Sequence, residues 1–130
     1  MELFNELNID PKTLSPLVLA YIGDTIYDLL TRGYIISNGN TPVNTMHKKA
    51  KNIVNATAQS KAYDIIKDVL TEEETAVFKR GRNAKSHTSA KNQSIVDYRR
   101  ATGIEALFGY LYLQHNFQRI TKLYKLILEG

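Results

Sequence analysis

Apolar residues recur at intervals of three and four through most of the chain, which is the spacing of one buried helix face. The most apolar of these stretches follows Ser15-Pro16. Serine accepts a hydrogen bond from a free amide at a helix N-terminus, and proline in the first position has no amide to leave unpaired. The pattern therefore predicts a helix from Ser15-Pro16 to about Arg32, ended by Gly33 and a loop over residues 38–40.

Three further helix starts or apolar faces follow in the next part of the chain. Thr41-Pro42 repeats the cap-and-proline signal and predicts a second helix that ends near Asn55, and a third apolar face runs over residues 58–69. Residues 71–74, Thr-Glu-Glu-Glu, have the form of a capping box, in which Thr and Glu bond each other's free backbone amides. The box predicts the start of a short fourth helix and explains this acidic run without a metal site.

Helical periodicity returns near the end of the chain, over residues 104–111 and again over residues 117–128. No segment has the alternating or Val-rich pattern of a strand, and there is no internal repeat. A chain of 130 residues is the usual size of one domain. We therefore expect a single domain over residues 1–130, an all-α bundle of six or seven helices.

Composition excludes several kinds of chemistry. The chain has no cysteine, so a thiol nucleophile, a disulfide framework and any cysteine-based zinc site are excluded. The N-terminal residues are acidic and polar, unlike a secretory signal, and the longest apolar stretch, Leu17 to Ile22, is too short to cross a bilayer. We expect a cytoplasmic protein with no membrane partner. The histidines have no metal-ligand spacing, and we interpret His47 and His115 as structural.

A basic segment stands out in the charge distribution. The net charge of the chain is +4, and seven cationic residues with a single acidic one lie between Lys79 and Arg100. Apolar periodicity is absent over residues 79–94, which predicts an exposed loop there. Basic side chains on such a loop suit phosphate oxygens, although an ordinary solvated loop has the same composition. The candidate nucleic-acid-binding residues are Lys79, Arg80, Arg82, Asn83, Lys85, Ser86, His87, Lys91, Arg99 and Arg100.

Two acidic residues lie on the most apolar helices, each close to a glycine. Asp24 follows Gly23, and Glu105 precedes Gly109 by four residues. A glycine inside a helix costs about 1 kcal/mol relative to alanine, which indicates a close approach of another backbone. Two such crossings would bring the acids together, and converging carboxylates favour a bound Mg²⁺. Alternatively, both acids are exposed and pair with Arg or Lys; Asp28, one turn after Asp24, is either a helper or a solvated residue.

Three segments together resemble the ribonuclease III catalytic domain, and most closely its stand-alone form, Mini-ribonuclease III: LAYIGDTIYD, KRGRNAKSHTSAKNQS and YRRATGIEALFGYLYL. The resemblance runs from about Leu14 to Leu128, and we expect the Mini form, which lacks the double-stranded-RNA-binding domain of full-length ribonuclease III. It implies a ribonuclease III-like helical fold and a Mg²⁺-dependent endoribonuclease that cleaves double-stranded RNA. Asp24 and Glu105 match the family's acidic residues, which implies that both are catalytic and ligate Mg²⁺.

The resemblance also implies partners. The family works as a homodimer, and the Mini form implies precursor 23S ribosomal RNA as the substrate, with a large-subunit ribosomal protein or the pre-ribosome as a further candidate partner. The dimer seam would be the apolar face of Tyr21, Ile22, Gly23 and Ile26, although these residues could equally fill the monomer's own core.

This chain departs from full-length ribonuclease III at two positions that carry carboxylates there, Ala20 and Thr102. Fewer anionic ligands imply a more weakly held, more hydrated metal. The alternative to an enzyme is a non-enzymatic RNA-binding or ribosome-assembly protein with the same fold; a helical protein-interaction module would explain neither the basic segment nor the placed acids.

Overall fold

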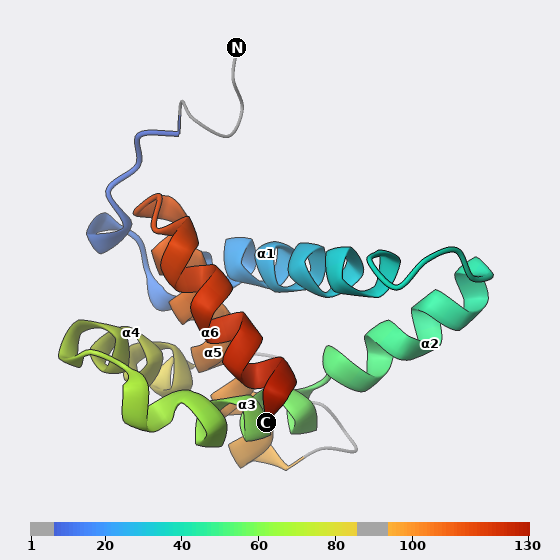
Figure 1. The fold of residues 1–130 in the computed structure, drawn as a ribbon. Helices are drawn as coiled ribbons and strands as arrows, with labels where there is room; N and C mark the ends of the chain where they lie inside the picture. The colour runs from blue at the N-terminus through green and yellow to red at the C-terminus, as the bar shows by residue number, and fades with distance from the viewer. Residues whose placement is uncertain (1–6, 86–93) are drawn as a thin grey trace.

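The computed structural model describes residues 7–85 and 94–130, and this part of the chain is helical without a strand. The predicted all-α bundle is confirmed (Figure 1). Two short 3-10 helices, at Pro11–Thr13 and Lys67–Val69, accompany six α-helices: α1 (Pro16–Ile36), α2 (Val43–Ile53), α3 (Ala56–Ile66), α4 (Glu72–Asn83), α5 (Ile95–Leu113) and α6 (Phe117–Glu129).

Most of the predicted helix starts are confirmed by their capping bonds. The Ser15 hydroxyl accepts from the Val18 amide at 3.3 Å, and both bonds of the Thr71–Glu74 capping box are present. Thr41 does not cap α2, because the residue before that helix is Pro42, which makes no side-chain capping bond. Local hydrogen-bonding chemistry therefore sets where most of these helices begin.

Two helices run further than the sequence predicts. α1 continues through Gly33 to Ile36, and Ile35 is buried there, so packing holds the last turn in the helix. α4 continues to Asn83, so the prediction of a loop from Lys79 onward was wrong for residues 79–83. Gly81 explains the second difference: it is buried, and a Cβ added to it would lie 2.7 Å from the Ala106 Cβ on α5, so the end of α4 packs closely on α5.

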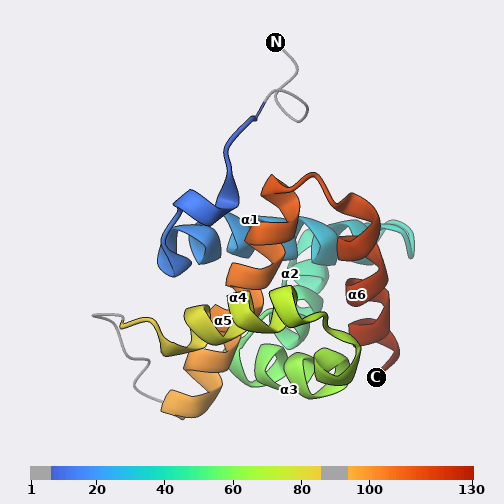
Figure 2. The ribbon, with the colours of Figure 1, turned by 90° about the vertical axis from the view of Figure 1, so that its left-hand side faces the viewer.

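α5 is the central helix of the bundle, and α1, α3, α4 and α6 all contact it (Figures 1 and 2). Its buried residues point in every direction around the helix instead of forming one stripe. The core that they form with residues from α1, α3, α4 and α6 includes Tyr27, Ile66, Phe78, Phe108 and Leu123. Because the middle of α5 is enclosed in this way, any polar group in it faces a neighbouring helix.

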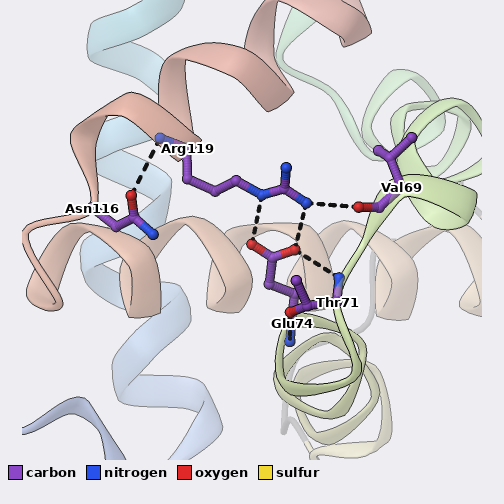
Figure 3. A network of polar contacts seen from close by, with 5 residues as sticks. All are labelled: Val69, Thr71, Glu74, Asn116 and Arg119. Atoms are coloured by element: carbon purple, nitrogen blue, oxygen red, sulfur yellow. Dashed lines mark hydrogen bonds and ion pairs between the residues drawn. The ribbon is translucent and has the colours of Figure 1, made fainter.

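An ion pair between the buried Glu74 and the partly buried Arg119 ties α4 to α6 (Figure 3). Two nitrogens of the Arg119 guanidinium donate to the two carboxylate oxygens of Glu74, each at 2.8 Å, and one of them also donates to the Val69 carbonyl at 2.7 Å. Burial opposes ionisation of Glu74, but the bonds from Arg119 and Thr71 outweigh it and hold the pKa of Glu74 below its ordinary value. Glu74 thus has a tertiary role in addition to its predicted capping role.

α2 is the outlying helix: it buries no residue and extends from the far end of α1 (Figure 1). In the part of the chain that the structure describes, no helix is long and apolar enough to cross a membrane.

Candidate active site

The site is built where α1 crosses α5 with the two backbones in contact. A Cβ added to Gly23 would lie 1.7 Å from the Glu105 carbonyl oxygen, and one added to Gly109 would lie 2.0 Å from the Leu19 carbonyl oxygen. Real Cβ atoms do not approach other atoms so closely, so each helix needs its glycine at this point. The predicted close approach is confirmed, and it is made between two helices of the same chain.

This crossing brings the carboxyl groups of Asp24 and Glu105 within hydrogen-bonding reach of each other. Glu105 is partly buried and Asp24 is exposed at the edge of the crossing. Burial, and then the hydrogen bond and negative charge of Asp24, raise the pKa of Glu105 to about 8. Among residues 7–85 and 94–130, neither acid forms an ion pair with an Arg or Lys. The two acids therefore face each other, and the alternative of separate surface pairs does not describe them within that part of the chain.

The donor set at this crossing fits a hard divalent cation. Carboxylate oxygens are the ligands that Mg²⁺ prefers, and a cation between two carboxylates would relieve the repulsion that, after burial, helps to raise the pKa of Glu105. The described residues contain no group of three or more His, Cys, Asp or Glu side chains able to hold a metal, so water would complete the coordination. The two positions that depart from the family pattern, Ala20 and Thr102, supply no carboxylate to the site. Ala20 is buried, and the Thr102 hydroxyl donates to the Tyr98 carbonyl at 3.1 Å.

A third polar side chain borders the acids and was missed in the sequence. Gln59, in the first turns of α3, lies beside Glu105 and partly offsets the rise in the pKa of that acid. Only 4% of Gln59 is exposed, and its Nε2 atom has no hydrogen-bond partner of ordinary geometry. The signal in the sequence was weak but present, since Gln59 interrupts the helical face formed by the buried Ala56, Ala62 and Ile66.

The predicted RNA-binding residues that the structure describes lie at the adjoining ends of α4 and α5. Arg82, Asn83, Arg99 and Arg100, with Lys67, line an open cleft of about 490 Å³ between α3, α4 and α5. Other members are exposed on or just after α4: Lys79, Arg80 and Lys85. Ser86, His87 and Lys91 lie outside the described residues.

Arg100 is already engaged inside the protein. Its guanidinium donates to Asp64 at 2.5 Å and to the Ser60 hydroxyl at 3.1 Å, and it lies over the Tyr63 ring at 4.9 Å. The hydrogen bond from Arg100 is the main cause that holds the pKa of Asp64 below its usual range. Arg100 thus joins α5 to α3, and Lys67 also pairs with Asp64 at 3.7 Å. Arg82 and Arg99 are therefore the freer basic residues of the cleft for phosphate.

The four residues of the predicted dimer seam do not share one environment. Gly23 is buried against α5 and Ile26 is 8% exposed in the core, so both have packing partners inside the monomer, which is the alternative that the sequence left open for them. Ile22 is partly buried against the α1–α5 core, and Tyr21 is 82% exposed. Of the four, Tyr21 is the residue that projects fully from the monomer.

Asp28 and His115 have structural partners. Asp28 accepts from the Arg32 Nε at 3.1 Å across one turn of α1. His115 occupies the turn between α5 and α6 with φ of 60°, and its Nε2 lies 2.9 Å from the Leu7 carbonyl oxygen. Neither residue reaches the Asp24–Glu105 pair through these contacts.

Comparison with known proteins agrees with this arrangement. The Ribonuclease III domain model matches residues 17–116. Mini-ribonuclease 3 of Clostridium tetani is 54% identical over 92% of this chain and 80% of its own length, and that of Enterococcus faecalis is 47% identical over 88% of both chains. The X-ray crystal structure of a Fusobacterium nucleatum protein superposes with a TM-score of 0.82 at 34% identity, covering 89% of this chain and 94% of that one.

The matched region contains both glycine crossings, both acids and the basic ends of α4 and α5. Identity at this level over nearly the whole chain, together with the helical arrangement, shows the family directly. The chain belongs to the ribonuclease III family, in its Mini-ribonuclease III branch, and is an endoribonuclease.

Proposed function

We propose that the chain is a Mg²⁺-dependent endoribonuclease that cleaves double-stranded RNA, with Asp24 and Glu105 as its catalytic metal ligands. The observation that carries the proposal is the meeting of these two carboxyl groups at the α1–α5 crossing, without a cationic partner among the described residues. Two acids held in contact on apolar helices are costly to the fold, so a functional partner for them is the simplest reason to keep both.

The residues of the crossing would do three things in the reaction. Asp24 and Glu105 would hold the cation, and the backbone contact at Gly23 would fix their separation. Glu105, whose pKa is raised to about 8, would have to be ionised to hold the cation, so binding should strengthen as the pH rises. Mg²⁺ supplies Lewis-acid chemistry, which activates water for attack on a phosphodiester and stabilises the charge that develops on the phosphate.

The basic ends of α4 and α5 would hold the RNA. Arg82, Lys85 and Arg99 offer cations for phosphate oxygens, and the proposed contacts continue into Ser86, His87 and Lys91. Phosphate contacts give affinity that is largely independent of sequence, and the wide, shallow minor groove of A-form RNA favours recognition by shape. Selection of duplex over single strands follows from this kind of contact.

The finer biological role is proposed from the family. We infer that the substrate is precursor 23S ribosomal RNA, matured in the cytoplasm, with a large-subunit ribosomal protein or the pre-ribosome as a partner. Cutting both strands of a duplex needs two sites, which a homodimer with two-fold symmetry provides. The exposed apolar residues Leu17, Val18 and Tyr21 on α1 support a seam there, because they would otherwise remain in water.

A cleavage assay tests the proposed activity. Wild-type protein and the Asp24→Asn variant are incubated with a long RNA duplex or a matched single strand, in Mg²⁺ or in EDTA. The proposal predicts cleavage of the duplex only, in Mg²⁺ only, and by the wild type only. Duplex binding without cleavage by the wild type in Mg²⁺ would contradict it.

A further inference from the structure

The starting observation is a buried amide on a helix face that is mostly apolar. Gln59 is 4% exposed and lies in the same stripe of α3 as the buried Ala56, Ala62 and Ile66. Buried polar groups in folded proteins nearly always have hydrogen-bond partners. The Nε2 atom of Gln59 has no partner of ordinary geometry, although its interaction with Glu105 is close enough to lower the pKa of that acid, so an apolar side chain of the same size would pack there at little cost.

The surroundings of Gln59 show what its amide faces. The side chain lies against Glu105, on the middle of α5. The adjacent residue, Ser60, accepts a hydrogen bond from Arg100 of α5 at 3.1 Å, and Asp64, one turn later, accepts from the same guanidinium at 2.5 Å. These two bonds fix the register of α3 on α5, so the Gln59 amide is held against Glu105 by the fold.

We propose that Gln59 is a third residue of the active site, a positioning residue whose Nε2 donates a hydrogen bond to the Glu105 carboxylate when Glu105 holds the cation. Carboxylates that ligate metals are commonly oriented by a hydrogen bond from a second residue, which fixes the oxygen that faces the metal. Asp24, whose carboxyl group meets that of Glu105, is an acceptor when ionised and offers no such bond. This inference rests on the proposed function, because the donor is needed only by an ionised, ligating Glu105.

The test uses the full chain with Gln59→Met, which keeps the length of the side chain and removes its donor, and Gln59→Leu as a second variant. Mg²⁺ affinity is measured by calorimetry, the melting temperature is measured in EDTA, and duplex affinity is measured in EDTA. We expect Mg²⁺ to bind about tenfold more weakly. The melting temperature in EDTA should stay the same or rise, because an unpaired buried donor has been removed, and the duplex affinity should not change.

The outcomes separate this inference from the proposed function. Mg²⁺ affinity within twofold of the wild type in both variants would overturn the role of Gln59, as would a fall in melting temperature or a loss of folding in both, since either would mark Gln59 as structural. A wild-type protein that neither binds Mg²⁺ nor cleaves duplex would instead refute the proposed function. If the wild type cleaves duplex, Asp24→Asn does not, and Gln59→Met binds Mg²⁺ as tightly as the wild type, then only the inference about Gln59 is refuted.

Discussion

Replacing Asp24 with Asn should stabilise the metal-free protein at high pH, even though it should abolish the activity. In EDTA at pH 9, the wild type carries two ionised carboxylates in contact, because this pH is above the pKa of about 8 for Glu105. Asparagine removes one of the two charges and offers an amide donor to the other. The variant therefore loses a repulsion and gains a hydrogen bond.

The magnitude follows from the exposure of the pair. Two unit charges about 4 Å apart interact by about 1 kcal/mol in water and about 4 kcal/mol near a protein surface. Because Asp24 is exposed, a gain of about 1–2 kcal/mol is the reasonable range. A domain of 130 residues unfolds with an entropy of about 2.1 cal/mol/K per residue, so each kcal/mol corresponds to about 4 °C. The expected rise in melting temperature is about 4–8 °C.

The stability of the metal-free protein, and with it the effect of Asp24→Asn, should depend on pH. Folded Glu105 keeps its proton up to about pH 8, whereas an unfolded glutamate releases it near 4.5. The metal-free wild type should therefore lose stability as the pH rises from 4.5 to 8 and change little above that. At pH 5.5 Glu105 is protonated in the folded protein, so the Asp24→Asn variant should gain nothing there.

Differential scanning calorimetry in EDTA at pH 5.5 and pH 9 measures both effects. Asp28→Asn is the matched control, since Asp28 lies one turn further along α1 and pairs with Arg32 instead of Glu105. The control should show no gain at pH 9. A lower melting temperature for Asp24→Asn at pH 9, or an equal rise at both pH values, would refute the claim that the two carboxylates repel each other in the folded state.

Three further predictions concern the fold and the RNA contacts. Gly23→Ala should destabilise the protein by more than about 3 kcal/mol in urea unfolding, because its Cβ would overlap the Glu105 carbonyl. Gly33→Ala is the control: it has open space around it and should stabilise the protein by about 1 kcal/mol. Equal effects of the two substitutions would refute the close crossing of α1 and α5. Arg119→Leu should cost about 3–5 kcal/mol at pH 7 by leaving Glu74 buried and unpaired. Because the ion pair lowers the pKa of Glu74, the difference in stability between the wild type and Arg119→Leu should shrink as the pH falls below about 4.5. A loss of stability that does not depend on pH would contradict this role of the ion pair. Lys85→Gln should reduce the salt slope of duplex binding by about 0.7–0.9 in filter binding, and an unchanged slope would exclude Lys85 from the interface.

Local signals in the sequence predicted most helix starts and the general architecture. The bonds accepted by Ser15 and the bonds of the Thr71–Glu74 box involve residues three apart, so they can be identified without the tertiary structure. Thr41 has the same side-chain chemistry as these caps but does not cap α2. The extension of α4 to Asn83 depends on packing of Gly81 against α5, which no local pattern reveals.

The candidate site could be predicted in kind but not in full. The glycines beside Asp24 and Glu105 indicated close backbone contacts, and the structure places those contacts between α1 and α5. The partner of each glycine was not evident, so Gly23 was also assigned to a dimer seam. Gln59 reaches Glu105 from a helix 46 positions earlier in the chain, and only the packing of α3 on α5 reveals this approach.

The central claim is that Glu105 acts in cleavage through the metal and not through the fold or the RNA grip. Glu105→Gln keeps the size of the side chain and removes its charge, so single-turnover cleavage and equilibrium binding of one RNA duplex, measured on the same preparation in Mg²⁺, test the claim directly. The account predicts that cleavage by the variant is lost while its duplex affinity stays within a few-fold of the wild type. Cleavage at the wild-type rate, or loss of cleavage and binding together, would contradict it.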